Sequence, residues 1–207
     1  MKIIGLTGPS GAGKGFSYHF FKKLDIPCID TDDVYHKLLL PPSTCVDELV
    51  KNFGTEILQN NGSVDRKILA NIVFSDESHK KLELLNQTTH KYVLDKTVSM
   101  LSEYKKAGKV AAVIDAPLLF ESGIDKECDF TVAVISDENV RVDRIMSRDS
   151  ITREAAEMRV HAQKSDDFYT SMATYSVTNN SDMKSLELQL EAILIKENLF
   201  TDRKDNS

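Results

Sequence analysis

The sequence predicts an α/β fold in which a mostly parallel central sheet is flanked by helices. Three observations lead to this prediction. Short, nearly continuous apolar runs alternate with amphipathic helical stretches, which is typical of parallel strands joined by right-handed helical crossovers. A glycine-rich segment, GPSGAGKG, separates the first apolar run from the first helix. The helical stretch over residues 33–107 is too long for a simple crossover and indicates an inserted subdomain.

The first part of the chain is predicted to be a strand, a glycine-rich turn and a helix. Residues 2–7 form the strand, and residues 14–24 carry apolar side chains at helical spacing, namely Phe16, Phe20, Phe21 and Leu24. A second strand is expected over 26–30. Asp32 suits the N-cap of the next helix, which the prolines at 41–42 stop.

The rest of the chain continues the alternation of helices and strands. Helices are expected over 43–54, 64–74, 76–107 and 137–164, the last with a break at the segment DSIT (149–152). Strands are expected over 109–115, 129–136 and 175–179. A closing helix follows over 182–200, with an apolar face formed by Leu186, Leu190, Ile193 and Leu194. The polar segment 201–207 is expected to fray.

The composition excludes several classes of protein. The chain has 207 residues and a net charge of −6, so no overall positive field would attract a nucleic acid. No apolar run reaches the roughly 18 residues that a membrane span needs. The first residues read as a strand and not as a signal peptide, and the three cysteines, Cys28, Cys45 and Cys128, form no paired motif. We therefore expect a cytoplasmic protein with reduced thiols that acts without nucleic acid or membrane.

The glycine-rich segment is predicted to bind phosphate groups. Gly8, Gly13 and Lys14 match the pattern G-x-x-x-x-G-K-[ST], in which backbone N–H groups and a lysine surround phosphates at a helix N-terminus. The alternative is that this segment forms only a tight turn and binds no phosphate. The last position of the pattern holds Gly15, which has no hydroxyl to offer a metal ion. Phosphates, waters and a carboxylate elsewhere would then hold Mg²⁺.

Carboxylates follow two of the predicted strands. In an extended chain Asp30 and Asp32 project to the same side, where one could accept the proton of an attacking hydroxyl and the other orient it. The alternative is that Asp32 only caps a helix. Asp115 ends a buried strand, where a carboxylate could hold Mg²⁺ through water, or merely bond to a backbone turn.

Five arginines gather in the region before the last strand. Arg141, Arg144 and Arg148 lie at spacings that share one helix face, and Arg153 and Arg159 follow the predicted break. A solvated charged face is the default for such a helix. Beside a phosphate loop, at least two of them are expected to form a lid that neutralises charge on a transferred phosphoryl group.

With these motifs in view, the chain resembles the dephospho-CoA kinase family over nearly its full length. The resemblance rests on GLTGPSGAGKG, on DTD at 30–32, on the pattern around Arg66 in FGTEILQNNGSVDRKILANIVF, on PLLFE at 117–121, on R-x-x-x-R-D at 144–149, on Ala162 and Gln163, and on VTNNS. The chain departs from the family pattern at Gly15, at Lys91, where the family has proline after a histidine, and at Ser181, where it has glycine.

The resemblance implies a P-loop kinase that uses ATP and Mg²⁺ to phosphorylate the ribose 3′-hydroxyl of dephospho-CoA. It implies catalytic roles for Asp32, Lys14, Arg144 and Arg148, and a metal role for Asp115. The implied ATP-binding residues are Gly8, Gly11, Ala12, Gly13, Lys14, Gly15, Phe16, Arg144, Arg148 and Asn179, the last near adenine. The implied acceptor-binding residues are Thr7, Asp30, Asp32, Arg66, His90, Pro117, Leu118 and Glu121.

The expected organisation is one kinase domain with three parts. The core comprises 1–32, 108–137 and 174–200, the helical acceptor subdomain 33–107, and the lid 138–173. The alternatives are a kinase for another nucleotide or small molecule, and a nucleotide-binding protein whose catalysis Gly15 has weakened. A monomer or a weak homo-oligomer is expected.

Overall fold

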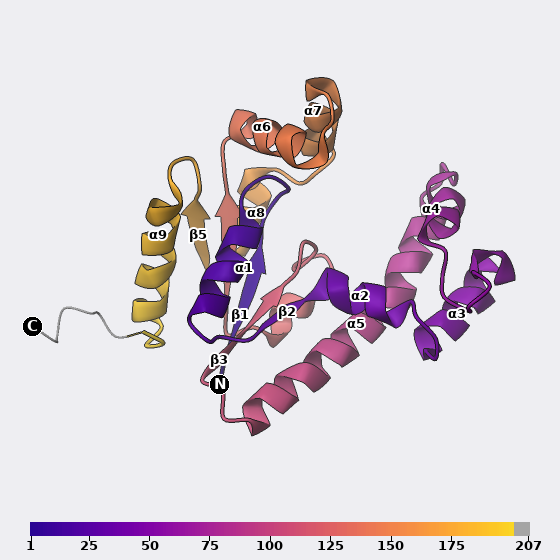
Figure 1. The fold of residues 1–207 in the computed structure, drawn as a ribbon, viewed down its shortest axis with the longest axis horizontal. Coiled ribbons are helices and arrows are strands. Elements are labelled where there is room, and N and C mark those ends of the chain that lie inside the picture. Colours follow the sequence, from indigo (N-terminus) through magenta and orange to yellow (C-terminus); the bar gives the residue numbers. More distant parts are fainter. Residues whose placement is uncertain (201–207) are drawn as a thin grey trace, which may run out of the picture. The chain divides into compact units, whose positions relative to one another are not determined.

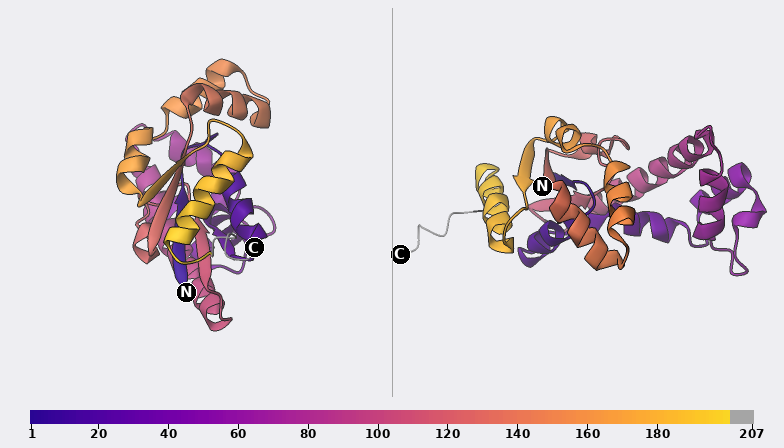
Figure 2. Two further views of the ribbon diagram at one scale, coloured as in Figure 1. Left: turned by 90° about the vertical axis from the view of Figure 1, so that its left-hand side faces the viewer. Right: turned by 90° about the horizontal axis from the view of Figure 1, so that it is seen from above.

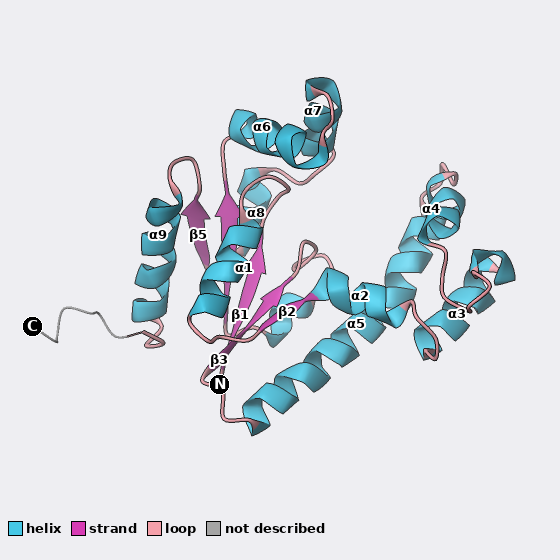
Figure 3. Cartoon of the chain, in the orientation of Figure 1, coloured by secondary structure: helices cyan, strands magenta, loops and turns pink. Residues whose placement is uncertain are grey.

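The computed structural model describes residues 1–200 and divides into two compact units. One unit is formed by Met1–Ile29 together with the chain from Glu103 onward, and the other by Asp30–Ser102. The expected polar tail over 201–207 lies outside the described residues. The strands, drawn in magenta in Figure 3, are β1 Lys2–Thr7, β2 Cys28–Asp30, β3 Ala111–Asp115, β4 Phe130–Ile135 and β5 Tyr175–Thr178.

The five strands form one sheet in the order β2-β3-β1-β4-β5. The pairs β1–β3, β1–β4 and β4–β5 are parallel, so their carboxyl ends meet at one edge. Leu6 is in register with Asp115, Thr7 with Ala133, and Ile135 with Thr178. In open α/β sheets the ligand crevice lies outside this edge, and the glycine-rich loop leaves the sheet there from the central strand β1.

Helices of the first unit enclose the sheet and extend beyond its carboxyl edge. They are α1 Lys14–Lys23, α6 Glu138–Asp149, α7 Arg153–His161, α8 Asp166–Met172 and α9 Met183–Lys196. Phe20 and Phe21 of α1 pack with the strands and with α9 in one core. Helices α6 and α7 lie beyond the arrowheads of the strands (Figure 1), and both views of Figure 2 agree with this placement.

The second unit is helical and has a core of its own. Its helices are α2 Thr31–Leu38, α3 Thr44–Phe53 and α4 Arg66–Phe74, with a short 3₁₀ turn at Thr55–Ile57 and most of α5, which spans Lys80–Lys106. Leu49 and Ile57 are fully buried in an apolar cluster with residues from each of these helices.

Most of the predicted elements are present, including the closing helix, whose apolar face is buried as expected. Two expectations need correction. The helix α2 begins at Thr31, and Asp30 is its N-cap, because its carboxylate accepts from the backbone N–H groups of Asp32 and Asp33. Asp30 and Asp32 therefore do not share an extended segment. The helix α8 was not expected; Ser165 caps it by accepting from the N–H of Phe168.

The break expected at 149–152 is present, and Thr152 caps α7, since its hydroxyl accepts from the N–H of Ala155. Cys28, Cys45 and Cys128 are free thiols, and burial raises the pKa values of Cys28 and Cys128 to about 12. Within residues 1–200, none of the helices combines the length and the apolar character that crossing a membrane requires. The division into core, acceptor subdomain and lid stays a prediction; the boundary between the two compact units falls inside α5.

Candidate functional site

Two glycines of the glycine-rich loop, Gly8 and Gly13, take backbone conformations that other residues rarely adopt. Gly8 has φ of 144°, and a Cβ there would lie 2.1 Å from the carbonyl oxygen of Val134 in β4. Gly13 has φ of 103° and is the N-cap of α1. The loop therefore turns sharply from β1 into α1. Helix geometry leaves the first N–H groups of α1 without partners in the helix, so this N-terminus favours an anion.

Lys14, the first residue of α1, contacts the carboxylate of Asp115 at the end of β3. Asp115 is buried, with 5% of its surface exposed. The register between β1 and β3 explains the contact of Lys14 with Asp115, because Asp115 lies beside Leu6, one residue before the end of β1. The structure thus brings together a cation and an anion that the sequence separates by about a hundred residues, at the mouth of the loop.

Gly15 is exposed, and a Cβ built on it would meet nothing within 4 Å. The absence of a side chain here is therefore not a steric requirement. Magnesium commonly takes one or two carboxylates, with waters and substrate phosphates completing its coordination. Asp115 offers one such carboxylate. Among residues 1–200, no three His, Cys, Asp or Glu side chains gather in a metal-binding group. The donor set fits an ion held chiefly by a nucleotide.

The segment 117–121 divides between core and surface. Leu119 is fully buried, whereas Leu118 is 46% exposed. The ring of Phe120 packs edge-on against Phe168 of α8, with centroids 6.1 Å apart. The hydroxyl of Thr7, at the end of β1, donates to the carbonyl oxygen of Pro117 at 3.4 Å, which ties this segment to the start of the loop. Glu121 is exposed.

Two of the five arginines face the loop. Arg144 donates to the carbonyl oxygens of Gly11 at 3.2 Å and Ala12 at 3.4 Å. Arg148 donates to the hydroxyl of Ser10 at 3.2 Å. The sequence spacing had put Arg141 on the same face. Arg141 is instead buried and donates to Asp166 of α8 at 2.9 Å, so its guanidinium links α6 to α8.

Asp149 organises the exposed arginines of this region. Its carboxylate accepts two hydrogen bonds from Arg148, at 2.8 and 2.9 Å, and contacts Arg159. Bonds from Arg148, and the charges of both arginines, hold the pKa of the Asp149 carboxyl below its usual range. Arg153 pairs with Asp143 at 2.5 Å. Arg148 and Arg159 are therefore held in one cluster, with Arg148 directed at the loop.

Some contacts at the loop involve side chains to which the sequence assigned no role. The amide oxygen of Gln163 accepts from the backbone N–H of Ser10 at 3.0 Å. The hydroxyl of Ser136 accepts from Arg144 at 3.4 Å and donates to the carbonyl oxygen of Asn179 at 2.9 Å. Ser136 directly follows β4, so its strand-end position was a usable signal. For Gln163 the only signal in the sequence was that it matches a position of the family pattern.

The remaining candidates belong to the helical unit. Asp30 caps α2, Asp32 lies exposed in the first turn of that helix, Arg66 opens α4, and His90 is half-buried in α5. They come from three different helices. Their roles toward a ligand stay predictions.

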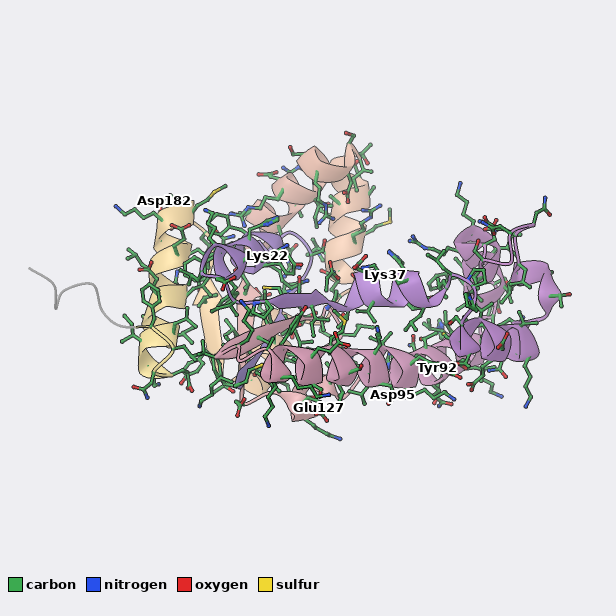
Figure 4. All side chains as sticks on the ribbon, turned by 60° about the horizontal axis from the view of Figure 1, so that its bottom comes forward. Lys22, Lys37, Tyr92, Asp95, Glu127 and Asp182 are labelled. Atoms are coloured by element: carbon green, nitrogen blue, oxygen red, sulfur yellow. The ribbon has the colours of Figure 1, made fainter. Side chains whose placement is uncertain are left out.

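Lys91, which replaces the family proline, allows α5 to run without interruption through this position. Its ammonium pairs with Glu48 of α3 at 2.6 Å, and the hydroxyl of Tyr92 donates to the same carboxylate at 2.6 Å. Tyr92 lies on α5 in Figure 4. The departure at Lys91 is therefore accommodated by a polar contact between two helices of this unit.

Comparison with known proteins agrees with this arrangement. The family model for dephospho-CoA kinase matches residues 2–185. A dephospho-CoA kinase from Fusobacterium nucleatum subsp. nucleatum is 39% identical over 189 residues, covering 91% of this chain and 95% of that protein. One from Lactobacillus acidophilus is 34% identical over 196 residues, covering 94% and 96%.

Solved structures share the fold. TT1252 from Thermus thermophilus superposes with a TM-score of 0.78 at 28% identity, covering 94% of this chain and 97% of that one. Dephospho-CoA kinase from Campylobacter jejuni superposes with a TM-score of 0.70 at 23% identity, covering 97% and 100%. The predicted α/β kinase fold with a parallel sheet is confirmed.

Proposed function

Because the chain belongs to the dephospho-CoA kinase family, we propose that it transfers the γ-phosphoryl group of ATP to the ribose 3′-hydroxyl of dephospho-CoA. The products are CoA and ADP, so this is the last step of CoA synthesis. The observation that carries the proposal is the loop after β1, with Lys14 and Asp115 at its mouth. A cation beside a helix N-terminus is the arrangement that binds a transferable phosphate.

The transfer is in line. The 3′-oxygen of the acceptor attacks the γ-phosphorus, the bond from that phosphorus to the β–γ bridging oxygen breaks, and ADP leaves. Asp32 accepts the proton of the attacking hydroxyl as general base. Lys14 exchanges its contact with Asp115 for the β- and γ-phosphates. Arg144 and Arg148 supply positive charge from the lid, where it stabilises the transferring group.

Backbone and side chains of the loop hold the nucleotide. The proposed ATP-binding residues are Gly8, Gly11, Ala12, Gly13, Lys14, Gly15, Phe16, Arg144 and Arg148. Asn179, which the resemblance places near adenine, is proposed below to act on the loop instead. Asp115 would hold Mg²⁺, directly or through water, while the phosphates supply further ligands. The ion would neutralise charge on the phosphates. The buried carboxylate of Asp115 and the open position at Gly15 support this assignment, since the ion then needs no loop hydroxyl.

A further set of residues is proposed to bind the acceptor. The proposed set is Thr7, Asp30, Asp32, Arg66, His90, Pro117, Leu118 and Glu121. The exposed Leu118 beside half-buried Pro117 supports an apolar wall for an organic acceptor. We also propose that the enzyme works in the cytoplasm as a monomer or a weak homo-oligomer.

The test is a coupled assay of ATP consumption with Mg²⁺, comparing dephospho-CoA with AMP, UMP and no acceptor. We expect consumption only with dephospho-CoA, and CoA as the product. The Lys14→Met variant is the negative control, because methionine keeps the side-chain length without the charge. ATP consumption with AMP or UMP would show that the acceptor is another nucleotide and not dephospho-CoA. Intact ATP binding with no consumption for any acceptor would mean that the protein binds nucleotide without transferring it.

A further inference from the structure

The carbonyl oxygens on the outer side of the phosphate loop need hydrogen-bond donors from the rest of the protein. A loop that turns its N–H groups toward a ligand turns carbonyl oxygens away from it, and buried carbonyls require partners. Ala12 is fully buried. Its carbonyl oxygen accepts from the amide nitrogen of Asn179 at 2.7 Å and from Arg144 at 3.4 Å. These two side chains therefore support the loop from behind.

Asn179 is itself held on several sides. Its backbone N–H donates to the carbonyl oxygen of Ile135 at 2.9 Å, which extends the pairing of β4 with β5 by one residue. Its carbonyl oxygen accepts from the hydroxyl of Ser136. Only 7% of the residue is exposed. The side chain is thus anchored to the carboxyl edge of the sheet before any nucleotide arrives.

Both ends of the Asn179 amide are already used. The nitrogen donates to Ala12, and the oxygen accepts from Arg144 at 3.4 Å. The nitrogen also lies directly over Gly13, where an added Cβ would come within 2.0 Å of it. This buried amide joins the loop to Arg144, and the hydrogen bonds that it makes at both of its ends are to the protein.

We propose that Asn179 is a positioning residue that sets the shape of the phosphate loop and orients Arg144, and that it does not recognise adenine. This inference rests on the proposed function only in requiring that the loop binds a nucleoside triphosphate. Asn179 then affects binding only through the phosphate chain of the ligand. Replacing it should weaken the binding of any triphosphate to the same extent, whether or not the molecule carries a base.

The test compares binding of ATP and of inorganic tripolyphosphate, each with Mg²⁺, by calorimetry or competition. In Asn179→Ala we expect both affinities to fall by the same factor, on the order of tenfold, since the buried carbonyl of Ala12 loses the nearer of its two donors. The matched control is Gln189→Ala. Gln189 exchanges two hydrogen bonds, both 2.9 Å, with the backbone of Thr178 but touches no part of the loop. It should change each affinity by no more than about twofold.

Hydrogen exchange of the loop amides over residues 11–15 provides a readout without ligand. We expect faster exchange in Asn179→Ala than in the parent protein or in Gln189→Ala, because the loop has lost its support. A fall in ATP affinity with unchanged tripolyphosphate affinity and unchanged exchange would overturn the proposal and make Asn179 a contact to the base. Equal losses in both variants would also overturn it.

If Asn179→Ala does not fold, Asn179→Asp keeps the size and the acceptor for Arg144. It replaces the donor to Ala12 with an oxygen, so we still expect weaker tripolyphosphate binding and faster loop exchange. Parent-like values for both in this variant would contradict the proposal. None of these measurements uses dephospho-CoA, so a failure of the proposed transfer reaction would be seen separately, in the acceptor assay.

Discussion

The two units of this chain carry their candidate chemistry in different ways. In the first unit the backbone is the binding element, shaped by glycines at positive φ, and side chains such as Arg144 and Asn179 hold it from outside. In the helical unit the candidates are separate side chains: Asp32, Arg66 and His90 project from three helices. Helices α2 and α4 begin at capping aspartates, and all three helices contribute apolar side chains to one core.

The difference explains why a short motif identifies one region and not the other. A phosphate loop needs a particular backbone path, so few residues are allowed at Gly8 and Gly13. A helix accepts many sequences, and a ligand-facing side chain on it leaves no local pattern. The loop can therefore be found from a single sequence, while the roles of the helical unit depend on measurement.

The largest effect is expected from Asp32→Asn, which tests the helical unit directly. Removing the proposed general base should lower kcat by about 10²- to 10⁴-fold and leave ATP affinity unchanged. Stopped assays and ATP titrations measure both quantities. The control is Asp33→Asn, the same change one residue later, at a carboxylate that pairs with Lys37 at 2.7 Å on the surface. Equal losses in the two variants would argue against a catalytic role for Asp32.

A second comparison places alanine at two neighbouring glycines of the loop. Gly13→Ala should weaken ATP binding by about 10- to 100-fold, because its Cβ displaces the Asn179 amide and its φ of 103° is strained. Gly15→Ala should remain within about twofold of the parent, since its Cβ enters open space. Calorimetric titration with ATP measures the affinity of each variant. Similar affinities in both variants would mean that backbone geometry is not what binds the phosphates.

Gly15→Ser should add the hydroxyl that the loop lacks. We expect Mg²⁺ to enhance ATP affinity more strongly in this variant, by about two- to tenfold relative to Gly15→Ala, the size of one added polar interaction. The measurement is ATP affinity with Mg²⁺ and with a chelator, in both variants. An unchanged ratio would show that the ion does not reach this position.

The smallest effect concerns Glu48, in the helical unit. Hydrogen bonds from Lys91 and Tyr92 hold the pKa of its carboxyl below the ordinary value of 4.5. The contribution of the Glu48 carboxylate to the free energy of unfolding is therefore complete above about pH 4.5. It is lost as the pH falls through the lower pKa of the folded state. Glu48→Gln should melt slightly below the parent at neutral pH, and the difference should close in acid. A difference that grows in acid would contradict this sign.

The sequence by itself determined most of the succession of elements, though not α8, and also the phosphate loop and the family, because periodicity, glycines and capping residues act over a few neighbouring positions. It could not place Asp30 correctly, since both Asp30 and Asp32 suit an N-cap and only the backbone path selects one. Nor could it separate Arg141, which is buried against α8, from Arg144, which faces the loop.

Those distinctions were decided by the tertiary structure. Strand order brings Asp115 to Lys14, and the end of β5 brings Asn179 to Ala12, across 101 and 167 positions of the chain. Contacts of this kind depend on how a sheet assembles and which carbonyls it leaves without donors. No local pattern encodes them, because the free energy that selects them comes from burying the whole sheet and satisfying its polar groups together.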